Sequence, residues 1–286
     1  MLLRQLFNHA TFSYTYLLAD PMSSEAVFID PVKGKLRDYV QLTNELGLTI
    51  TAAIDTHHHD DWITGITALR DLWGCDAISG APNENPGVNR QVEDGDTIKV
   101  GGMQLSVIHT PGHTEDSYCY LIEQPGKSAV FTGDTLLVRT VGLSNQGTSN
   151  PRMHYDSLYN VLAELPDDTI IYPGRDFKGW PLSTIGEEKS FNPYMLTKGI
   201  EFFLALKDRQ EPADIQPLVK VEEEEVDEAI EETVKEALKS GEVGPDFYLP
   251  DDESKTEAKP VEKTEEKTDA ELPAELDDAS KVRSWH

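Results

Sequence analysis

The chain has 286 residues, a hydrophobic fraction of 38% and a formal net charge of −27 at pH 7. A charge this negative argues against nucleic acid and anionic membranes as partners, because both are polyanions. The sequence contains no run of about 18 apolar residues, which argues against a membrane-spanning helix. Its first residues lack the apolar core and cleavage site of a secretory signal, so we expect no leader peptide.

Much of the negative charge lies in the last quarter of the chain. From Glu211 onward there are 25 acidic and 9 basic residues, which together contribute −16 of the −27 charges. This shift in composition predicts a globular domain over 1–210, an acidic extension over 211–248 and a tail over 249–286. The tail consists mainly of Glu, Lys, Asp, Pro and Thr and has almost nothing to bury, so we predict that it is disordered.

The acidic extension contains one helical pattern. Apolar residues recur every four positions and predict an amphipathic helix at about 222–240, which Gly241 can end. These residues are Val226, Ile230, Val234 and Leu238. The helix either packs on its own domain or, together with the acidic tail, binds another protein. A homodimer is also compatible with the sequence.

The chain contains only two cysteines. Cys75 and Cys119 both lie within apolar stretches, where a thiol behaves as a small buried side chain. We therefore expect two reduced thiols rather than a disulfide, which is typical of a cytoplasmic protein.

In chain order, the first half of the domain is predicted to form strands at 12–18 and 26–29, a helix at 35–46, a strand at 48–54 and a helix at 63–73. The second half is predicted to form strands at 98–100, 103–108, 118–122 and 129–131, a helix at 155–165, a strand at 169–172 and helices at 183–190 and 194–206. Turn signals such as Asp20-Pro21 and Gly101-Gly102 separate these runs. Groups of short strands with helices between them indicate a mixed α and β fold whose sheets are covered by helices.

Residues with metal-binding chemistry follow several of the predicted strands. His57 and His59 stand two positions apart directly after a β-rich run, so both imidazoles of an extended segment would project to the same side. His113 follows a Pro-Gly turn, and Asp134 follows a glycine at a predicted strand end. Strand-end loops that present imidazole, imidazole and carboxylate form a reasonable metal site.

Each of these motifs has a plainer interpretation when it is taken alone. A histidine pair in a loop is more often a surface feature than a ligand set, and a Gly-Asp dipeptide is more often a turn. The joint pattern is much more specific, because the motifs occur in this order and each follows a predicted strand.

The series His57-x-His59-x-Asp61, followed by His113 and Asp134, resembles the motif series of the metallo-β-lactamase superfamily. The resemblance runs over about residues 2–206. Within the superfamily, several stretches are similar to the persulfide dioxygenases, among them 3–7, 25–31, 93–96 and 131–139. The resemblance implies an α+β fold, namely an αββα sandwich with its site on one edge, here with an acidic C-terminal extension.

The resemblance also implies one Fe(II) per chain, held by the positions that match His57, His113 and Asp134, with Zn(II) as the alternative metal. It implies that His59 lies close by as a candidate further ligand or catalytic group, and that Asp61 orients a ligand or water next to the metal. The reaction of such an enzyme joins both oxygens of O2 to the outer sulfur of a persulfide, and hydrolysis of the S–S bond then releases sulfite and the free thiol.

The resemblance implies glutathione as the carrier of the persulfide. Arg139 matches a basic position near the substrate pocket, and Arg175 could add a second contact to an anion. Arg139 could equally be a structural ion-pair residue. The residues after Arg139 depart from the usual segment of the family, so a different low-molecular-weight persulfide remains open.

Two positions depart from the superfamily motif. A histidine usually follows the aspartate, where this chain has Trp62, and another stands in the last segment, where this chain has Arg175. Both histidines serve the second metal of binuclear relatives. Tryptophan cannot ligate a metal, and arginine stays protonated and repels a cation. The substitutions therefore disfavour a two-metal hydrolase and leave the first metal site complete; Phe177 also lacks the hydroxyl of the tyrosine that is common there.

Three functions follow as hypotheses. The first is an iron-dependent persulfide dioxygenase. The second is a hydrolase with one zinc ion that acts on a thioester or lactone, like glyoxalase II, through metal-bound hydroxide. The third is a degenerate, non-catalytic fold that binds a partner through its acidic helix and tail.

Overall fold

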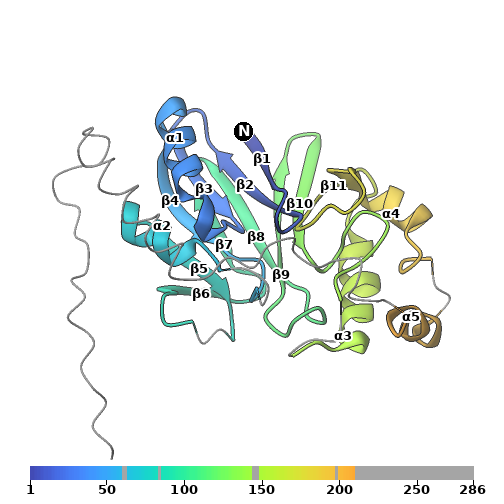
Figure 1. The fold of residues 1–286 in the computed structure, drawn as a ribbon. Coiled ribbons are helices and arrows are strands. Elements are labelled where there is room, and N and C mark those ends of the chain that lie inside the picture. The colour runs from blue at the N-terminus through green and yellow to red at the C-terminus, as the bar shows by residue number, and fades with distance from the viewer. Residues whose placement is uncertain (60–62, 83–84, 144–147, 197–198, 210–286) are drawn as a thin grey trace, which may run out of the picture. The chain divides into compact units, whose positions relative to one another are not determined.

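The structure is a computed structural model that describes residues 1–59, 63–82, 85–143, 148–196 and 199–209, all within one unit, Met1–Tyr248. The helix predicted at about 222–240 and the tail predicted at 249–286 lie outside these residues. Two six-stranded sheets form the centre of the unit, and helices cover the outer side of each (Figure 1). Within the described ranges, every helix is too short or too polar to span a membrane.

The first sheet is built from the N-terminal third of the chain. In sheet order its strands are β1 (Leu2–Asn8), β2 (Ser13–Ala19), β3 (Glu25–Ile29), β4 (Thr49–Ile54), β5 (Asp76–Gly80) and β6 (Arg90–Val92). β2 is antiparallel to both of its neighbours, β1 and β3, whereas β3, β4, β5 and β6 run parallel to one another. Parallel neighbours need a crossover connection. A short 3₁₀ turn (Lys33–Lys35) with helix α1 (Leu36–Leu46) provides the first crossover, and helix α2 (Ile66–Trp73) provides the second.

β2 is covered on both faces, and all seven of its residues are buried. Tyr14, Tyr16 and Leu18 belong to the core between the two sheets, whereas Leu17 and Ala19 belong to the core beneath α1 and α2. Alternate side chains of a strand point to opposite faces. The strand predicted at 12–18 is thus buried on both sides, with Ser13 and Thr15 among its buried residues.

The second sheet has the order β12-β11-β10-β9-β8-β7. Its strands are β7 (Thr97–Val100), β8 (Met103–His109), β9 (Tyr118–Gln124), β10 (Lys127–Gly133), β11 (Ile170–Pro173) and β12 (Ser183–Thr184). All neighbours are antiparallel except β10 and β11, which are parallel. Three helices accompany this sheet: α3 (Pro151–Asp156), which continues through a π turn (Ser157–Val161) and a 3₁₀ turn (Leu162–Glu164), α4 (Ile185–Phe191) and α5 (Ile200–Lys207).

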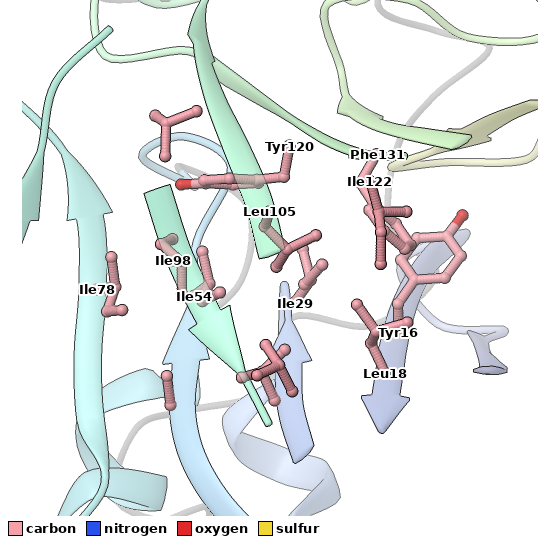
Figure 2. Close-up of a cluster of buried hydrophobic side chains, with 14 of the residues drawn as sticks. Tyr16, Leu18, Ile29, Ile54, Ile78, Ile98, Leu105, Tyr120, Ile122 and Phe131 are labelled. Carbon is pink, nitrogen blue, oxygen red and sulfur yellow. The ribbon is translucent and has the colours of Figure 1, made fainter. Parts of the chain in front are cut away.

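Three apolar layers result from this arrangement. The middle layer lies between the sheets, and Figure 2 shows part of it, including Tyr16 and Phe131, whose ring centroids lie 5.0 Å apart. The outer layers lie between each sheet and its helices, with Leu69 of α2 in one and Phe203 of α5 in the other. Burial of one such side chain contributes about 1.5–3 kcal/mol. The αββα sandwich that the resemblance implied is thereby confirmed.

Some predicted elements have different bounds in the structure. Ser183 and Thr184, predicted to be helical, pair with β11 as β12, and the Thr184 side chain caps α4. The helix predicted at 194–206 is wrong at its start, because 194–196 form turns and α5 begins only at Ile200. The Asn192 side chain holds this turn by accepting a hydrogen bond from the backbone of Tyr194.

Other elements were not predicted at all. β1, β5 and β6 were missed because their residues alternate only weakly between apolar and polar. The first turn of α3 was also missed, although Asn150 caps it and Pro151 follows. Cys75 and Cys119 are buried free thiols, which confirms that expectation.

Candidate metal centre

Four loops meet at one edge of the two sheets. His57 follows β4, His113 follows β8, Asp134 directly follows β10 and Arg175 follows β11. β8 and β10 are both antiparallel to β9, so they run in the same direction, and β11 is parallel to β10. The carboxyl ends of these three strands therefore lie at one edge. The end of β4 joins them because the carbonyl of Thr56 accepts a hydrogen bond of 2.8 Å from the first residue of β9.

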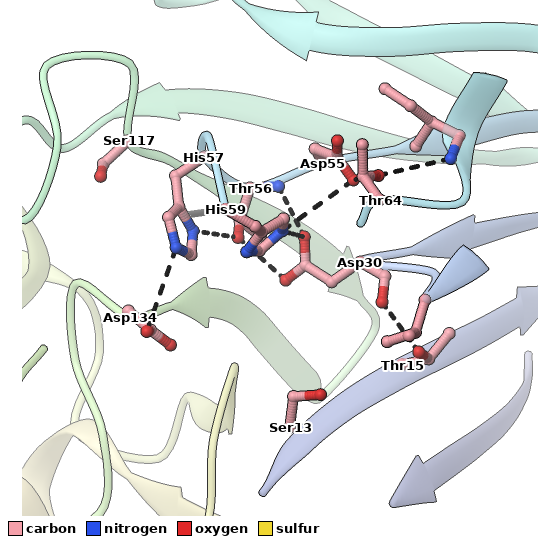
Figure 3. Close-up of polar contacts among 12 residues, drawn as sticks. Ser13, Thr15, Asp30, Asp55, Thr56, His57, His59, Thr64, Ser117 and Asp134 are labelled. Atoms are coloured by element: carbon pink, nitrogen blue, oxygen red, sulfur yellow. Dashed lines mark hydrogen bonds and ion pairs between the residues drawn. The ribbon is translucent and has the colours of Figure 1, made fainter. Parts of the chain in front are cut away.

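Three side chains from these loops converge. His57, His113 and Asp134 each place one ligand atom within 4.8 Å of the others. Oδ2 of Asp134 lies 4.0 Å from Nε2 of His57 (Figure 3) and 3.7 Å from Nε2 of His113. His57 and Asp134 are buried, and the His113 side chain is 13% exposed. The structure thus brings two imidazoles and one carboxylate together from separate loops.

A chain of hydrogen bonds orients His57. The Thr56 hydroxyl donates to Oδ2 of Asp30 at 2.9 Å, and the Thr56 backbone N–H donates to Oδ1 at 2.7 Å (Figure 3). A hydroxyl has only one proton, so Oγ1 of Thr56 must accept in the 2.9 Å bond that it makes with Nδ1 of His57. The proton of His57 therefore sits on Nδ1, and Nε2 presents a lone pair toward Asp134.

A backbone carbonyl places the proton of His113 on Nδ1 as well. Its Nδ1 lies 2.7 Å from the carbonyl oxygen of Leu143. A carbonyl can only accept, so Nδ1 carries the proton and Nε2 keeps its lone pair. The ammonium group of Lys207 on α5 donates to the adjacent carbonyl of Gly142, which ties this loop to the helix. Both imidazoles therefore point the atom that can bind a metal at the same carboxylate.

Burial keeps both imidazoles neutral. Removal from water lowers the pKa of His57 well below its usual value, and the neighbouring His59, His113 and Arg175 lower it further. Burial is also the largest cause that lowers the pKa of His113, against the opposing charge of Asp134. Neutral imidazole is the form that binds a metal ion, so no proton has to be displaced.

The Asp134 carboxylate still has an oxygen that can accept a further bond. Its Oδ1 is buried and makes no hydrogen bond within the described part of the chain, a state that costs about 1–3 kcal/mol for a buried polar atom. Its Oδ2 accepts a hydrogen bond of 2.6 Å from Nε of Arg175, and both side chains are buried. One carboxylate and two neutral imidazoles fit a single divalent metal ion.

Gly133 allows β10 to approach the histidine segment. Its φ is +48°, and a Cβ atom at this position would lie 2.4 Å from Oγ1 of Thr56. Any larger residue would therefore push Thr56 away from His57 and Asp30. The Gly-Asp dipeptide thus allows a close approach as well as a turn.

His59 lies beside the three converging side chains, in a second buried cluster. Its Nε2 is 3.4 Å from Oδ1 of Asp30 and 4.0 Å from Oδ1 of Asp55 (Figure 3). Its ring centroid is 4.2 Å from that of His57. Burial raises the pKa of Asp55 to about 7, against the lowering effect of His59. His59 as a catalytic group or further metal ligand stays a prediction, and Asp61, the other predicted catalytic residue, lies outside the described residues.

Arg139, predicted to bind substrate, lies in an ion-pair network. Its guanidinium pairs with Glu187 and with the fully buried Glu188 of α4. It also lies against the rings of Trp180 and Phe191, with centroid distances of 5.9 and 5.2 Å. These contacts support the structural interpretation of Arg139, and its contact with substrate stays a prediction. Arg175, the second predicted substrate contact, pairs with Asp134 as described above.

Two side chains that orient the site were not singled out from the sequence. Asp30 and Thr56 hold His57, and Asp30 does so with a φ of +52°, which aspartate tolerates better than most residues. The available signals were an aspartate at a strand end and a threonine directly before the histidines. Nothing in the sequence could single out the carbonyl of Leu143, because every residue has a backbone carbonyl.

Comparison with known proteins adds to this geometry. The sequence model of the metallo-beta-lactamase superfamily matches residues 11–175. The fold and the converging ligands at the sheet edge thus define a protein of the metallo-β-lactamase class.

The relatives narrow this class. Over 207 residues the chain is 38% identical to the mitochondrial persulfide dioxygenase ETHE1 of Homo sapiens, a match that covers 71% of this chain and 79% of that protein. The crystal structure of ETHE1 from Myxococcus xanthus matches with a TM-score of 0.70 and 40% identity, covering 75% of this chain and 95% of that one. The probable hydroxyacylglutathione hydrolase glo2 of Schizosaccharomyces pombe is 32% identical over 213 residues, which cover 64% of this chain and 82% of that protein. The chain belongs to the metallo-β-lactamase superfamily and, within it, to the persulfide dioxygenase family.

Proposed function

We propose that this protein is a mononuclear non-haem iron persulfide dioxygenase. Its reaction would oxidise the outer sulfur of glutathione persulfide, or of a similar low-molecular-weight persulfide, with O2, and water would cleave the S–S bond to release sulfite and the free thiol. The observation that carries the proposal is the convergence of His57, His113 and Asp134. Two histidines and one carboxylate form the ligand set of ferrous enzymes that use O2. The relatives named persulfide dioxygenase support the same reaction.

The residues of the chain would hold the ion in a defined orientation. His57 and His113 would bind through Nε2, and Asp134 through its carboxylate. A bound ferrous ion would supply redox chemistry and open positions for O2 and a persulfide sulfur, and the persulfide would provide the electrons that reduce O2. Thr56 and the carbonyl of Leu143 fix both imidazoles before any metal binds. Such outer hydrogen bonds are known to set ligand orientation and metal affinity.

A zinc-dependent hydrolase of a thioester is the second candidate. The similarity to a protein named hydroxyacylglutathione hydrolase favours it. A second ion beside Asp134 would face the guanidinium of Arg175, which donates to Oδ2 of Asp134 at 2.6 Å and repels other cations. A single-zinc version is compatible with the three converging side chains, because zinc binds the same donor atoms.

Metal content and oxygen consumption separate these candidates. The full chain, purified without air, should contain about one iron per chain and consume O2 when glutathione persulfide is added. His113→Ala should lose the iron, whereas His58→Ala should keep it, because His58 is exposed and lies in the same segment as His57. Zinc without O2 uptake would favour the hydrolase, and iron retained by His113→Ala would refute the ligand set. A chain that binds no metal and ignores both substrates would favour a binding protein.

We also propose that the protein is located in the cytoplasm. The two buried free thiols support a reducing compartment, whereas the mammalian relatives are named as mitochondrial. Cell fractionation followed by immunoblotting would decide between the two compartments.

The division into a domain over 1–210, an extension over 211–248 and a tail over 249–286 also stays a proposal. Limited proteolysis should remove the tail first and leave the metal-binding domain intact. Light scattering on the same sample would test for a homodimer, and a pull-down with the acidic tail would test for a protein partner.

A further inference from the structure

A two-residue segment after β10 connects two of the converging ligands. The N–H of Gly142 donates to the carbonyl of Asp134 at 2.8 Å, and the carbonyl of Leu143 accepts from Nδ1 of His113 at 2.7 Å. Gly142 lies so close to both ligands that a Cβ atom there would be 2.5 Å from the Asp134 carbonyl and 2.7 Å from Nδ1 of His113. We call Gly142 and Leu143 the ligand bridge. A shift of this bridge would move the acceptor that orients His113.

Lys207 holds the ligand bridge from the side of the helices. It is the last residue of α5, and its amine donates to the carbonyl of Gly142. Phe203 lies one helical turn earlier and therefore on the same face of α5. It is fully buried, and its ring centroid is 5.8 Å from that of Tyr194. The Lys207 amine lies 5.9 Å from the same Tyr194 ring, so the packing of α5 brings its last residue to the bridge.

The hydrogen bond from Lys207 restricts a residue that is otherwise free to rotate. Glycine adopts a wider range of backbone angles than other residues. The Asp134 carbonyl fixes the direction of the Gly142 N–H, and Lys207 fixes the direction of the Gly142 carbonyl. Because the peptide bond is planar, the second bond also fixes the N–H of Leu143. Only the backbone angles of Leu143 then remain to place the carbonyl that accepts from His113.

Stability alone does not account for a lysine at this position. Lys207 is only 7% exposed, and burial lowers the pKa of its amine to about 7. An apolar side chain would fill the same space without the cost of removing an amine from water. The amine has N–H donors in either protonation state, so its bond to Gly142 does not depend on its charge.

We propose that Lys207 is a positioning residue of the metal centre, which sets the orientation of His113 through the ligand bridge. The inference rests on the ligand set of the proposed function, because His113 has to bind the metal for its orientation to matter. It makes the end of α5 a part of the metal centre, although the ligands themselves come from loops at the sheet edge.

Lys207→Met tests the proposal, because it keeps the length of the side chain and removes the donor. The full-length protein would be loaded with Co(II), and its affinity measured by competition with a chelator. We expect the affinity to fall about 10-fold, the lower end of the effect of groups that orient metal ligands. The free energy of unfolding of the metal-free chain at pH 7 should not fall with it, because the variant also removes the cost of burying an amine.

Proton NMR of the Co(II) protein reports on each imidazole separately. The paramagnetic ion shifts the Nδ1 proton of a bound histidine far outside the usual range, so signals are expected from His57 and from His113. Thr56→Val assigns the first, because Thr56 holds Nδ1 of His57. In Lys207→Met the His113 signal should shift and exchange faster with deuterated water, whereas the His57 signal should stay unchanged.

Two control variants separate the amine from general packing. Lys189→Met removes an amine that donates to the carbonyl of Ala163 at 3.2 Å on an exposed side chain, and it should keep the wild-type affinity and signals. Phe203→Leu weakens the packing of α5 but keeps the donor, so it should lower the free energy of unfolding and leave the His113 signal in place. Wild-type affinity with an unchanged His113 signal in Lys207→Met would overturn the proposal, as would an equal loss of affinity in Phe203→Leu.

The proposed function fails by a different readout. If Lys207→Met has the expected effects but the iron form of the wild type consumes no O2 with glutathione persulfide, the dioxygenase is contradicted and the role of Lys207 stands. O2 consumption by the wild type together with an unchanged His113 signal in Lys207→Met would refute only the role of Lys207. A wild-type chain that binds no Co(II) would refute both.

Discussion

Replacing Thr56 by valine tests how the protein orients His57. The substitution keeps the size and branching of the side chain but removes the hydroxyl that donates to Asp30 and accepts from Nδ1 of His57, both at 2.9 Å. Thr56 is 1% exposed, so water cannot replace either bond. His57 then loses the group that fixes its protonated nitrogen, and Asp30 keeps only the backbone N–H of residue 56.

The expected losses follow from these two bonds. Removal of a partner that orients a metal-bound imidazole lowers metal affinity about 10–100-fold, which equals about 1.4–2.8 kcal/mol. In the metal-free protein, each buried polar atom left without a partner costs about 1–3 kcal/mol. We therefore expect Thr56→Val to weaken iron binding by one to two orders of magnitude and also to lower the free energy of unfolding of the apoprotein.

Both quantities are measurable on the same variant. Competition with a chelator under anaerobic conditions gives the iron affinity, and urea denaturation gives the free energy of unfolding. Thr51→Val is the matched control, because the Thr51 hydroxyl on β4 donates only to the backbone carbonyl of Ala26, at 3.3 Å. The control should bind iron like the wild type. Wild-type iron affinity in Thr56→Val would show that the Asp30–Thr56–His57 chain does not orient the ligand.

The remaining predictions concern α4 and α5. Glu188→Gln should lower the free energy of unfolding by about 3 kcal/mol, because it removes the charge of a fully buried carboxylate that pairs with the 18% exposed Arg139, whereas Glu187→Gln should cost about 0–1 kcal/mol, because Glu187 is 45% exposed. Equal losses in urea denaturation would contradict the buried network. Burial lowers the pKa of Lys207 to about 7, whereas a lysine of the unfolded chain titrates near about 10.4. Between these values the unfolded chain binds a proton that the folded protein does not, so Lys207 makes stability rise with pH by up to about 1.4 kcal/mol per unit. Lys207→Met should remove this rise between pH 7 and 10, and parallel stability curves for the two proteins would argue against a buried amine.

The sequence by itself determined most of the local structure and the identity of the converging residues. The β-rich sequences of β2 and β4 and the helical spacing of α1 and α2 are local signals, since each depends on residues within one strand or a few helical turns. The order of His57, His113 and Asp134 after predicted strands was also readable. The chemistry of these side chains limits them to few roles, which is why a metal site could be predicted before any contact was known.

Tertiary structure alone decided how the predicted residues are partnered. Arg175 and Asp134 lie 41 positions apart, and Arg139 and Glu188 lie 49 apart, so nothing in the local sequence indicates either pair. The parallel pairing of β10 with β11 brings Arg175 to Asp134, and the docking of α4 encloses Arg139. Chain direction within a sheet and the packing of helices on it are set by long-range contacts. The sequence predicted both Arg139 and Arg175 as substrate contacts, and only the tertiary structure shows that each guanidinium pairs with a buried carboxylate, Glu188 and Asp134 respectively.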